Sequence, residues 1–234
     1  MLCSVLQTPL SDSVLSSHIC NTDLANNKLK KMAGLRTLTK LRKIDLGANR
    51  IRVMEVDELA PLVNLEELWL GKNKIEEIQG LDTLTKLRRL DVQSNRLTSV
   101  ANLSTQAPIL EELFLAHNGT DDEGASQPTG LAQEFARLSI LDLSRNRLTT
   151  TAQFAHLNTL DELWISGNNI ESFENVQALA ALTNLDTVYL EYNPFQDNDP
   201  LYRRRLTELL PNLKQIDATL IGRNPVSQPP EAMD

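Results

Sequence analysis

Residues 65–73 read LEELWLGKN, and residues 160–168 read LDELWISGN. Both stretches place apolar residues at positions 1, 4 and 6 and an asparagine at position 9, with a tryptophan between the last two apolar residues. Two such matches, far apart in one chain, call for a search for an internal repeat.

The pattern LxxLxLxxN fits the chain in eight registers. The spacings between successive asparagines are 22, 24, 22, 23, 28, 22 and 25 residues. The registers end at Asn27, Asn49, Asn73, Asn95, Asn118, Asn146, Asn168 and Asn193, and the first of them is the weakest match. A period near 22 residues with this pattern is typical of leucine-rich repeats.

The residue types explain the expected structure. In each repeat the central LxL is a short strand whose two apolar side chains point into the core, while the residue between them points outward. The asparagine ends the strand and can hydrogen-bond backbone groups that the turn leaves unpaired, so successive asparagines can form a ladder. The rest of each repeat must lead from the end of one strand back to the start of the next. In a repeat of about 22 residues this return segment is too short for a long helix, so we predict short 3₁₀ turns.

We therefore predict an α/β solenoid, a leucine-rich repeat horseshoe with parallel strands on its concave face. The repeats span residues 19–222, with an irregular segment at 1–18 and a flexible tail at 223–234. The 28-residue spacing predicts a flexible loop insertion at about residues 119–130. A helical cap at about 199–222 has Asp199 as N-cap and Pro200 as first helical residue, and its helix stops at Pro211.

Composition narrows the class of protein. The net charge of −8 and a sequence pI near 5.0 argue against nucleic acid or an anionic membrane as the main partner. The two cysteines, in no CxxC motif, indicate a reducing compartment, and the lack of a long apolar run argues against a membrane partner. We also expect a monomer. His18, His117 and His156 do not converge, so we expect no enzyme, no metal site and no cofactor.

The outward residue between the two core positions of each strand is the informative one. The aspartates in this row fit a solvated, idle surface, whereas large aromatics there indicate a binding hot spot. We expect Trp164 and Tyr189 to stack because they are adjacent, and Trp69 and Phe114, each flanked by aspartates, to touch no other ring. The row reads Asp23, Asp45, Trp69, Asp91, Phe114, Asp142, Trp164 and Tyr189.

A second outward row lies two residues earlier in each strand. In this row Glu162 stands beside Trp164, and its carboxylate could orient an arginine or lysine of a partner. The other members that we place here are Lys43, Glu67, Arg89, Glu112 and Thr187.

Several segments together resemble the leucine-rich repeat regulatory subunit of protein phosphatase 1. The similar segments are LGKNKI at 70–75, QSNRLT at 93–98, and VYLE at 188–191 followed by Asn193-Pro194. The ending from Tyr202-Arg203-Arg204 to Gln215-Ile216-Asp217-Ala218-Thr219 is similar as well. The resemblance covers residues 24–222, and it implies further N-terminal repeats that are absent from this sequence.

The resemblance implies a non-catalytic regulator in nucleus and cytoplasm. It would bind the phosphatase catalytic subunit through its concave face, and a further phosphatase regulator could join the complex. The contact residues carried over from the family are Asp45, Trp69, Phe114, Asp142, Glu162, Trp164 and Tyr189.

Two alternatives keep the repeat and change the role. A scaffold that binds another intracellular protein, such as a spliceosomal RNA-binding subunit, would use a similar C-terminal cap. A GTPase-activating repeat protein would have longer repeats, near 28–29 residues, and only one spacing here reaches that length.

Overall fold

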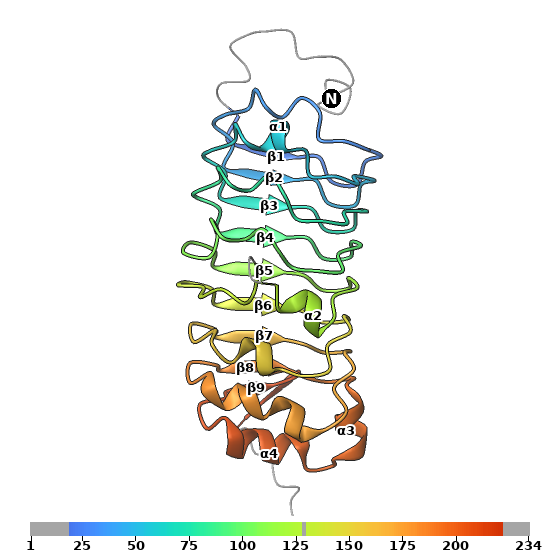
Figure 1. The fold of residues 1–234 in the computed structure, drawn as a ribbon, viewed down its shortest axis with the longest axis vertical. Coiled ribbons are helices and arrows are strands. Elements are labelled where there is room, and N and C mark those ends of the chain that lie inside the picture. The colour runs from blue at the N-terminus through green and yellow to red at the C-terminus, as the bar shows by residue number, and fades with distance from the viewer. Residues whose placement is uncertain (1–18, 128–129, 222–234) are drawn as a thin grey trace, which may run out of the picture.

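A computed structural model describes residues 19–127 and 130–221. Its strands form one sheet in chain order, stacked along the long axis of the molecule (Figure 1). Strands β1 to β9 pair in parallel, and β10 pairs antiparallel with β9. The strands are β1 Asn21–Asp23, β2 Lys43–Asp45, β3 Glu67–Trp69, β4 Arg89–Asp91, β5 Glu112–Phe114, β6 Ile140–Asp142, β7 Glu162–Trp164, β8 Thr187–Tyr189, β9 Gln215–Ile216 and β10 Thr219–Leu220.

The strands follow the predicted alternation. The middle residue of each strand from β2 to β8 is fully buried and pairs in register with the middle residue of the next, as Ile44 does with Leu68 and Leu68 with Leu90. The residues on either side of it face away from the core. The leucine-rich repeat solenoid predicted from the 22-residue period is confirmed.

The return segments are short, as the repeat length predicts. They contain α1 (Val56–Leu59), α2 (Asp122–Ala125), the 3₁₀ helices η3 (Ala152–Phe154) and η4 (Phe173–Ala181), and at the C-terminal end α3 (Pro194–Asn198) and α4 (Tyr202–Leu209). Phe154, Phe173, Val176 and Leu179 face the core from the two 3₁₀ helices. Each return therefore supplies the second wall of the core, opposite the strands.

The predicted asparagine ladder is present and links every repeat to the one before it. Asn168 Nδ2 donates to Ile165 O (2.9 Å) in its own repeat and to Leu143 O (3.0 Å) in the preceding repeat. Its Oδ1 accepts from Leu148 N at 3.0 Å. The same three-way bonding is made by Asn49, Asn73, Asn95, Asn118, Asn146 and Asn193, and with Asn168 these are the ladder asparagines.

The residue before each ladder asparagine adopts a left-handed backbone conformation, which the sequence did not indicate. Gly167 (φ +67°) is suited to it, but Ala48 (φ +51°), Lys72 (φ +56°) and Arg145 (φ +55°) are not glycine. A side chain in this region is disfavoured. The asparagine's bonds to both repeats hold the turn in place against that cost.

Residues 121–127 of the predicted loop insertion include the short helix α2, which the sequence did not predict. Asp121 caps α2 by accepting from Gly124 N at 2.9 Å, and Val100 N donates to Gly124 O at 2.9 Å. A Cβ on Gly124 would lie 2.1 Å from Thr98 O, so the glycine permits this close packing. Residues 128–129, the irregular segment 1–18 and the tail 223–234 lie outside the described residues.

The C-terminal cap begins later than predicted. Helix α4 starts at Tyr202 with Leu201 in the N-cap position, not at Pro200 with Asp199 as N-cap. Asp199 instead accepts from Leu201 N at 3.0 Å and forms an ion pair with Arg205 at 2.6 Å. Helix α3 was not predicted. It forms because Pro194 occupies its first position, while the side chain of the preceding Asn193 bonds within the ladder.

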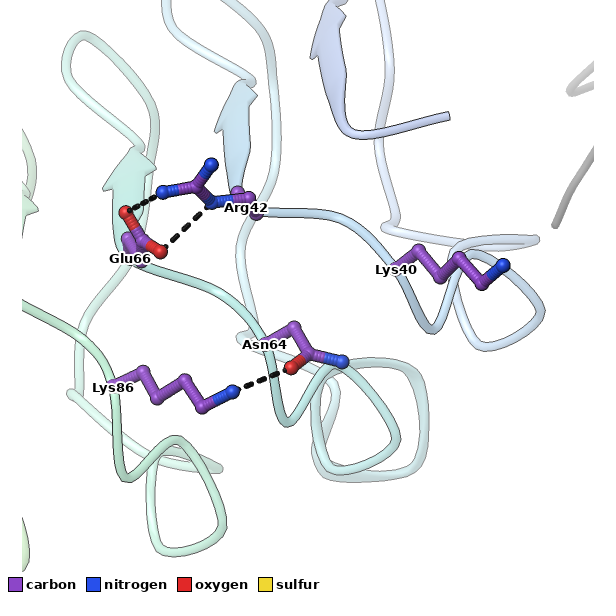
Figure 2. Close-up of a pocket in the computed structure, with 5 residues that line it drawn as sticks. All are labelled: Lys40, Arg42, Asn64, Glu66 and Lys86. Carbon is purple, nitrogen blue, oxygen red and sulfur yellow. Dashed lines mark hydrogen bonds and ion pairs between the residues drawn. The ribbon is translucent and has the colours of Figure 1, made fainter. Parts of the chain in front are cut away.

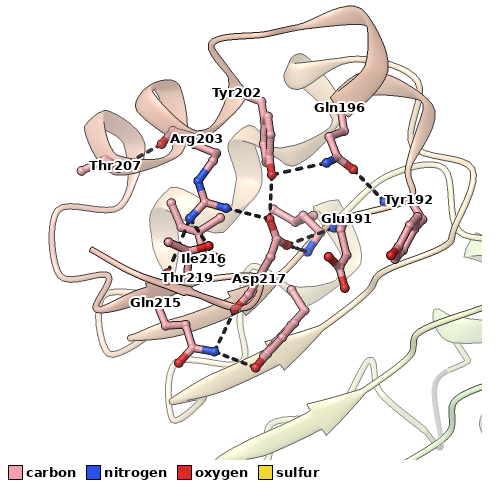
Figure 3. Close-up of polar contacts among 12 residues, drawn as sticks. Glu191, Tyr192, Gln196, Tyr202, Arg203, Thr207, Gln215, Ile216, Asp217 and Thr219 are labelled. Atoms are coloured by element: carbon pink, nitrogen blue, oxygen red, sulfur yellow. Dashed lines mark hydrogen bonds and ion pairs between the residues drawn. The ribbon is translucent and has the colours of Figure 1, made fainter. Parts of the chain in front are cut away.

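Asp217 closes the ladder at this end (Figure 3). Its Oδ1 accepts from the backbone N–H groups of Leu190 (2.8 Å) and Glu191 (3.0 Å). Its Oδ2 accepts from the Tyr202 hydroxyl (2.7 Å) and from Arg203 (3.2 Å). Burial and the bond to Asp217 raise the pKa of Tyr202. One buried carboxylate therefore joins α4 to the last full repeat.

Replacing a ladder asparagine should destabilise the solenoid. Asn168→Ala leaves the buried N–H of Leu148 without a partner and removes one of the two asparagine donors from each of the carbonyls of Leu143 and Ile165. We therefore expect the free energy of unfolding in urea to fall by about 2–3 kcal/mol. The neighbouring, exposed Asn169→Ala is the matched control and should change it by less than about 0.5 kcal/mol. Equal losses in the two variants would contradict the ladder's role.

The cap contact can be tested with a tyrosine pair. Tyr202→Phe removes the hydroxyl donor to the buried Asp217 carboxylate and should lower the free energy of unfolding by about 1–2 kcal/mol. Tyr192→Phe changes a residue that is 76% exposed and should leave the urea midpoint unchanged. An unchanged midpoint in Tyr202→Phe would show that the hydroxyl does not hold the cap.

Candidate functional site

The outward side of strands β1–β8 carries two parallel rows of side chains, which we call the strand face. One row holds the first residue of each strand and the other holds the third, and the in-register pairing aligns both across the sheet. The residues that the sequence analysis predicted to contact a partner are Asp45, Trp69, Phe114, Asp142, Glu162, Trp164 and Tyr189. The structure places all seven on these two rows.

Three of the aromatic residues form one cluster. Trp164 packs edge-to-face against Tyr189, with ring centroids 5.4 Å apart, as its adjacent position predicts. Trp164 also meets Phe114 edge-to-face at 6.3 Å, across the intervening strand β6. The prediction that Phe114 could touch no other ring is wrong, because it considered the spacing of strands and neglected the reach of an indole ring over the short Asp142 side chain.

Each tryptophan is held by the glutamate two residues before it. Trp164 Nε1 donates to Glu162 Oε2 at 3.1 Å, and Trp69 Nε1 donates to Glu67 Oε2 at the same distance. The Glu-Leu-Trp sequence, found in both β3 and β7, therefore fixes an indole ring on the strand face. Glu162 orients a tryptophan of its own chain, a role that the sequence did not predict.

Trp69 touches cations instead of aromatic rings. The Arg89 guanidinium lies 4.4 Å from the Trp69 ring centroid and 4.9 Å from that of Phe114, so it bridges the two rings. Lys43 lies on Trp69 at 5.1 Å. Contacts of this kind are worth about 0.5–1 kcal/mol at exposed sites. Arg89 thus extends the aromatic cluster as far as β3.

The same cations pair with glutamates of the first row. Lys43 meets Glu67 at 3.0 Å, and Arg89 meets Glu112 at 3.0 Å. The face from β2 to β8 is therefore continuous, with alternating charge at its N-terminal half and aromatic rings at its C-terminal half. Lys43, Arg89, Glu67 and Glu112 were not among the predicted contacts, although their alternation two residues before the aromatic row was visible in the sequence.

The aspartates of the third position are structural. Asp45 accepts from Gly47 N (2.8 Å), Asp91 from Gln93 N (2.9 Å) and Asp142 from Ser144 N (2.9 Å), so each caps the turn that follows its strand. Asp91 is only 4% exposed and Asp142 only 6%. The interpretation of this row's aspartates as idle and solvated is wrong for these two, because both are buried and both bond the turn that follows their strand.

Burial affects the chemistry of these two carboxyl groups. It raises the pKa of Asp142 against the opposing effect of the bond from Ser144, and it raises the pKa of Asp91 against the bonds from Gln93. Burial therefore disfavours the charged form of both carboxyl groups.

The edge where the strands begin carries a separate ladder of charge (Figure 2). Glu66 accepts from Arg42 (2.8 Å) and from Arg88 (3.2 Å), and the bond from Arg42 lowers the pKa of Glu66. Lys86 donates to Asn64 at 2.7 Å. The cations of these pairs are exposed, so the pairs hold neighbouring repeats together only weakly.

The described residues offer little for catalysis. Within residues 19–127 and 130–221, no three His, Cys, Asp or Glu side chains are placed to hold a metal ion. His156 Nε2 lies 2.9 Å from Leu131 O, a backbone contact, and His18 lies outside the described part. Among the described helices, none has the length and apolar character to cross a bilayer.

The repeats, the asparagine ladder and the single sheet define a leucine-rich repeat protein. A family model described as "Leucine Rich repeats (2 copies)" matches residues 63–105. In structure the chain is similar to a leucine-rich repeat protein of Leptospira interrogans, with TM-score 0.69 and 28% identity over 83% of this chain and 48% of that one. An internalin of Listeria monocytogenes has the same TM-score at 25% identity, over 92% and 59%.

In sequence the chain is similar to regulatory subunits of protein phosphatase 1. It is 45% identical over 71 residues to "Protein phosphatase 1 regulatory subunit SDS22" of Schizosaccharomyces pombe, covering 30% of this chain and 21% of that protein. It is 46% identical over 52 residues to human "Protein phosphatase 1 regulatory subunit 7", covering 22% and 14%. The chain therefore matches about a fifth or less of the length of these relatives.

The raised pKa of the buried Asp142 carboxyl predicts how the free energy of unfolding depends on pH. A raised pKa means that the folded state binds this proton more tightly than the unfolded state, whose pKa is about 3.9. The stability that this group contributes is present below that pH and is lost as the pH rises through the folded pKa. Asp142→Asn keeps an acceptor for Ser144 and removes the charge, so its stability relative to the unmutated protein should be greater at about pH 7 than at about pH 4.

Urea unfolding of both proteins at the two pH values measures this effect. Asp142→Ala is the control, since it also lacks the titrating group but removes the acceptor, and it should be less stable than Asp142→Asn by about 1–2 kcal/mol at either pH. A constant difference between Asp142→Asn and the unmutated protein across this range would contradict the raised pKa.

Proposed function

We propose that this chain is a non-catalytic regulatory subunit that binds the catalytic subunit of protein phosphatase 1 through the strand face, on the concave side of the repeats. The names of its sequence relatives support the regulatory role and the partner. The observation that carries the choice of surface is the continuous strip from Trp69 through Arg89 and Phe114 to Trp164 and Tyr189.

This strip has the composition of a protein-binding hot spot. Trp, Tyr and Arg are the residues that most often dominate binding energy at interfaces. Here the hydrogen bonds from Glu67 and Glu162 hold both indoles before a partner arrives, so little side-chain freedom remains to be lost on binding. The rings are half-buried, which leaves one side of each available to a partner.

The remaining parts of the proposal follow from this role. The chain acts as a monomer in nucleus and cytoplasm, and a further phosphatase regulator can join the complex. The aspartates at 45 and 142 contribute by holding the turns that present the aromatic row, with Asp45 the more accessible of the two.

The test is binding of purified phosphatase catalytic subunit to this chain and to Trp164→Ala/Tyr189→Ala, measured by calorimetry. Removing two neighbouring anchors should weaken binding by about 2 kcal/mol or more. Tyr192→Ala, which removes a tyrosine that is 76% exposed and lies on a turn outside the strands, is the matched control and should bind normally.

Circular dichroism melts of all three proteins separate folding from binding. A double variant that is folded and binds as well as the unmutated chain would rule out the strand face as the binding surface. Failure of the unmutated, folded chain to bind would rule out this partner for the chain as it stands.

A further inference from the structure

The charge of this chain is distributed very unevenly. Residues 24–54 hold nine lysines and arginines and one acidic residue, Asp45, although the whole chain has 23 basic and 31 acidic residues. The rest of the chain is therefore strongly acidic and the first repeats strongly basic. Such asymmetry is a physical indication of an interaction with an anionic partner.

The structure gathers part of this charge around a hollow at the edge where the strands end. This edge is opposite the one in Figure 2 and is separate from the strand face. Arg50 and Lys74 each follow a ladder asparagine. Arg50 N donates to Leu29 O and Lys74 N donates to Ile51 O, and these bonds align successive repeats at this edge. The hollow is lined by Lys30, Lys31, Arg50, Arg52, Val53, Glu55 and Lys74, and we call it the basic hollow.

The five cations of the basic hollow outnumber its acidic residues, since Glu55 is the one carboxylate that lines it. Within the described residues, none of its lysines or arginines forms an ion pair, whereas Arg42, Arg88 and Lys214 on the opposite edge all do. Its one carboxylate, Glu55, accepts from Met32 N at 3.1 Å. Glu76, an acidic residue of the following repeat, pairs with Arg96. Five cations therefore repel one another across a small surface.

Apolar surface accompanies the charge. Val53 is 49% exposed at the hollow, and Val56, which opens helix α1 just beyond it, is 47% exposed. Residues 24–54 contain no Phe, Tyr or Trp. Single-stranded nucleic acid is bound largely by stacking bases on such rings, so their lack favours a peptide.

We propose that the basic hollow is a docking site for an extended acidic segment of a partner protein, in which aspartates and glutamates alternate with apolar side chains. The carboxylates pair with Arg50, Arg52, Lys74, Lys30 and Lys31, and an apolar side chain covers Val53. The site is distinct from the strand face, so it does not depend on the function proposed above.

A fluorescein-labelled synthetic peptide of alternating glutamate and leucine is the probe, and fluorescence anisotropy with the full chain is the measurement. We expect saturable binding that weakens as salt is raised. Arg50→Gln/Arg52→Gln/Lys74→Gln should weaken it about tenfold or more, since each lost pair contributes a modest amount. Lys40→Gln/Arg137→Gln/Arg147→Gln removes the same charge from exposed positions outside the hollow and should change the affinity less than about twofold.

The controls distinguish the proposal from its rivals. Trp164→Ala/Tyr189→Ala should bind the peptide normally at a temperature where it is folded, and neither triple variant should have a lower thermal midpoint than the unmutated chain. Equal weakening by the two triple variants would overturn the proposal, because it would show non-specific attraction. So would equal binding of a glutamine-leucine peptide, tighter binding of a single-stranded RNA of similar length, or self-association of the chain that the hollow variant abolishes.

Discussion

The structure depends on the hydrogen bonds by which each ladder asparagine joins two successive repeats. One buried amide donates to carbonyls in both repeats and accepts from a third backbone group, so neighbouring turns have a single relative position. Burying such an amide is favourable only when all of its bonds are made, and a slipped repeat would break them. This constraint keeps every strand in register and makes the outward rows line up.

The strand face is a consequence of that register. Because third positions align across the sheet, the ring of Trp164 reaches both Tyr189 on the next strand and Phe114 two strands away. Arg89 then joins Phe114 to Trp69. The same contacts that stabilise the face also hold its anchors in place, so structural and binding roles are combined in one set of side chains. Single-ring substitutions will therefore affect both, and melts must accompany binding data.

The fold could be read from the sequence because leucine spacing and asparagine position report directly on burial and on turn bonding. Seven outward residues were placed on the correct face for the same reason. Periodicity carries no information on side-chain reach, so it missed the Phe114–Trp164 contact, and none on tertiary capping, so it misplaced the start of α4 and overlooked the packing that Gly124 allows. The burial of Asp142 depends on neighbouring strands and was equally invisible.

The most direct test of the account is oxidative footprinting of aromatic side chains with and without the phosphatase catalytic subunit. The account predicts that Trp69, Trp164 and Tyr189 are protected in the complex, while the exposed Tyr192 reacts at an unchanged rate and serves as internal reference. Protection of Tyr192 with unchanged reactivity of the two tryptophans would contradict the central claim, because the partner would then lie away from the strand face.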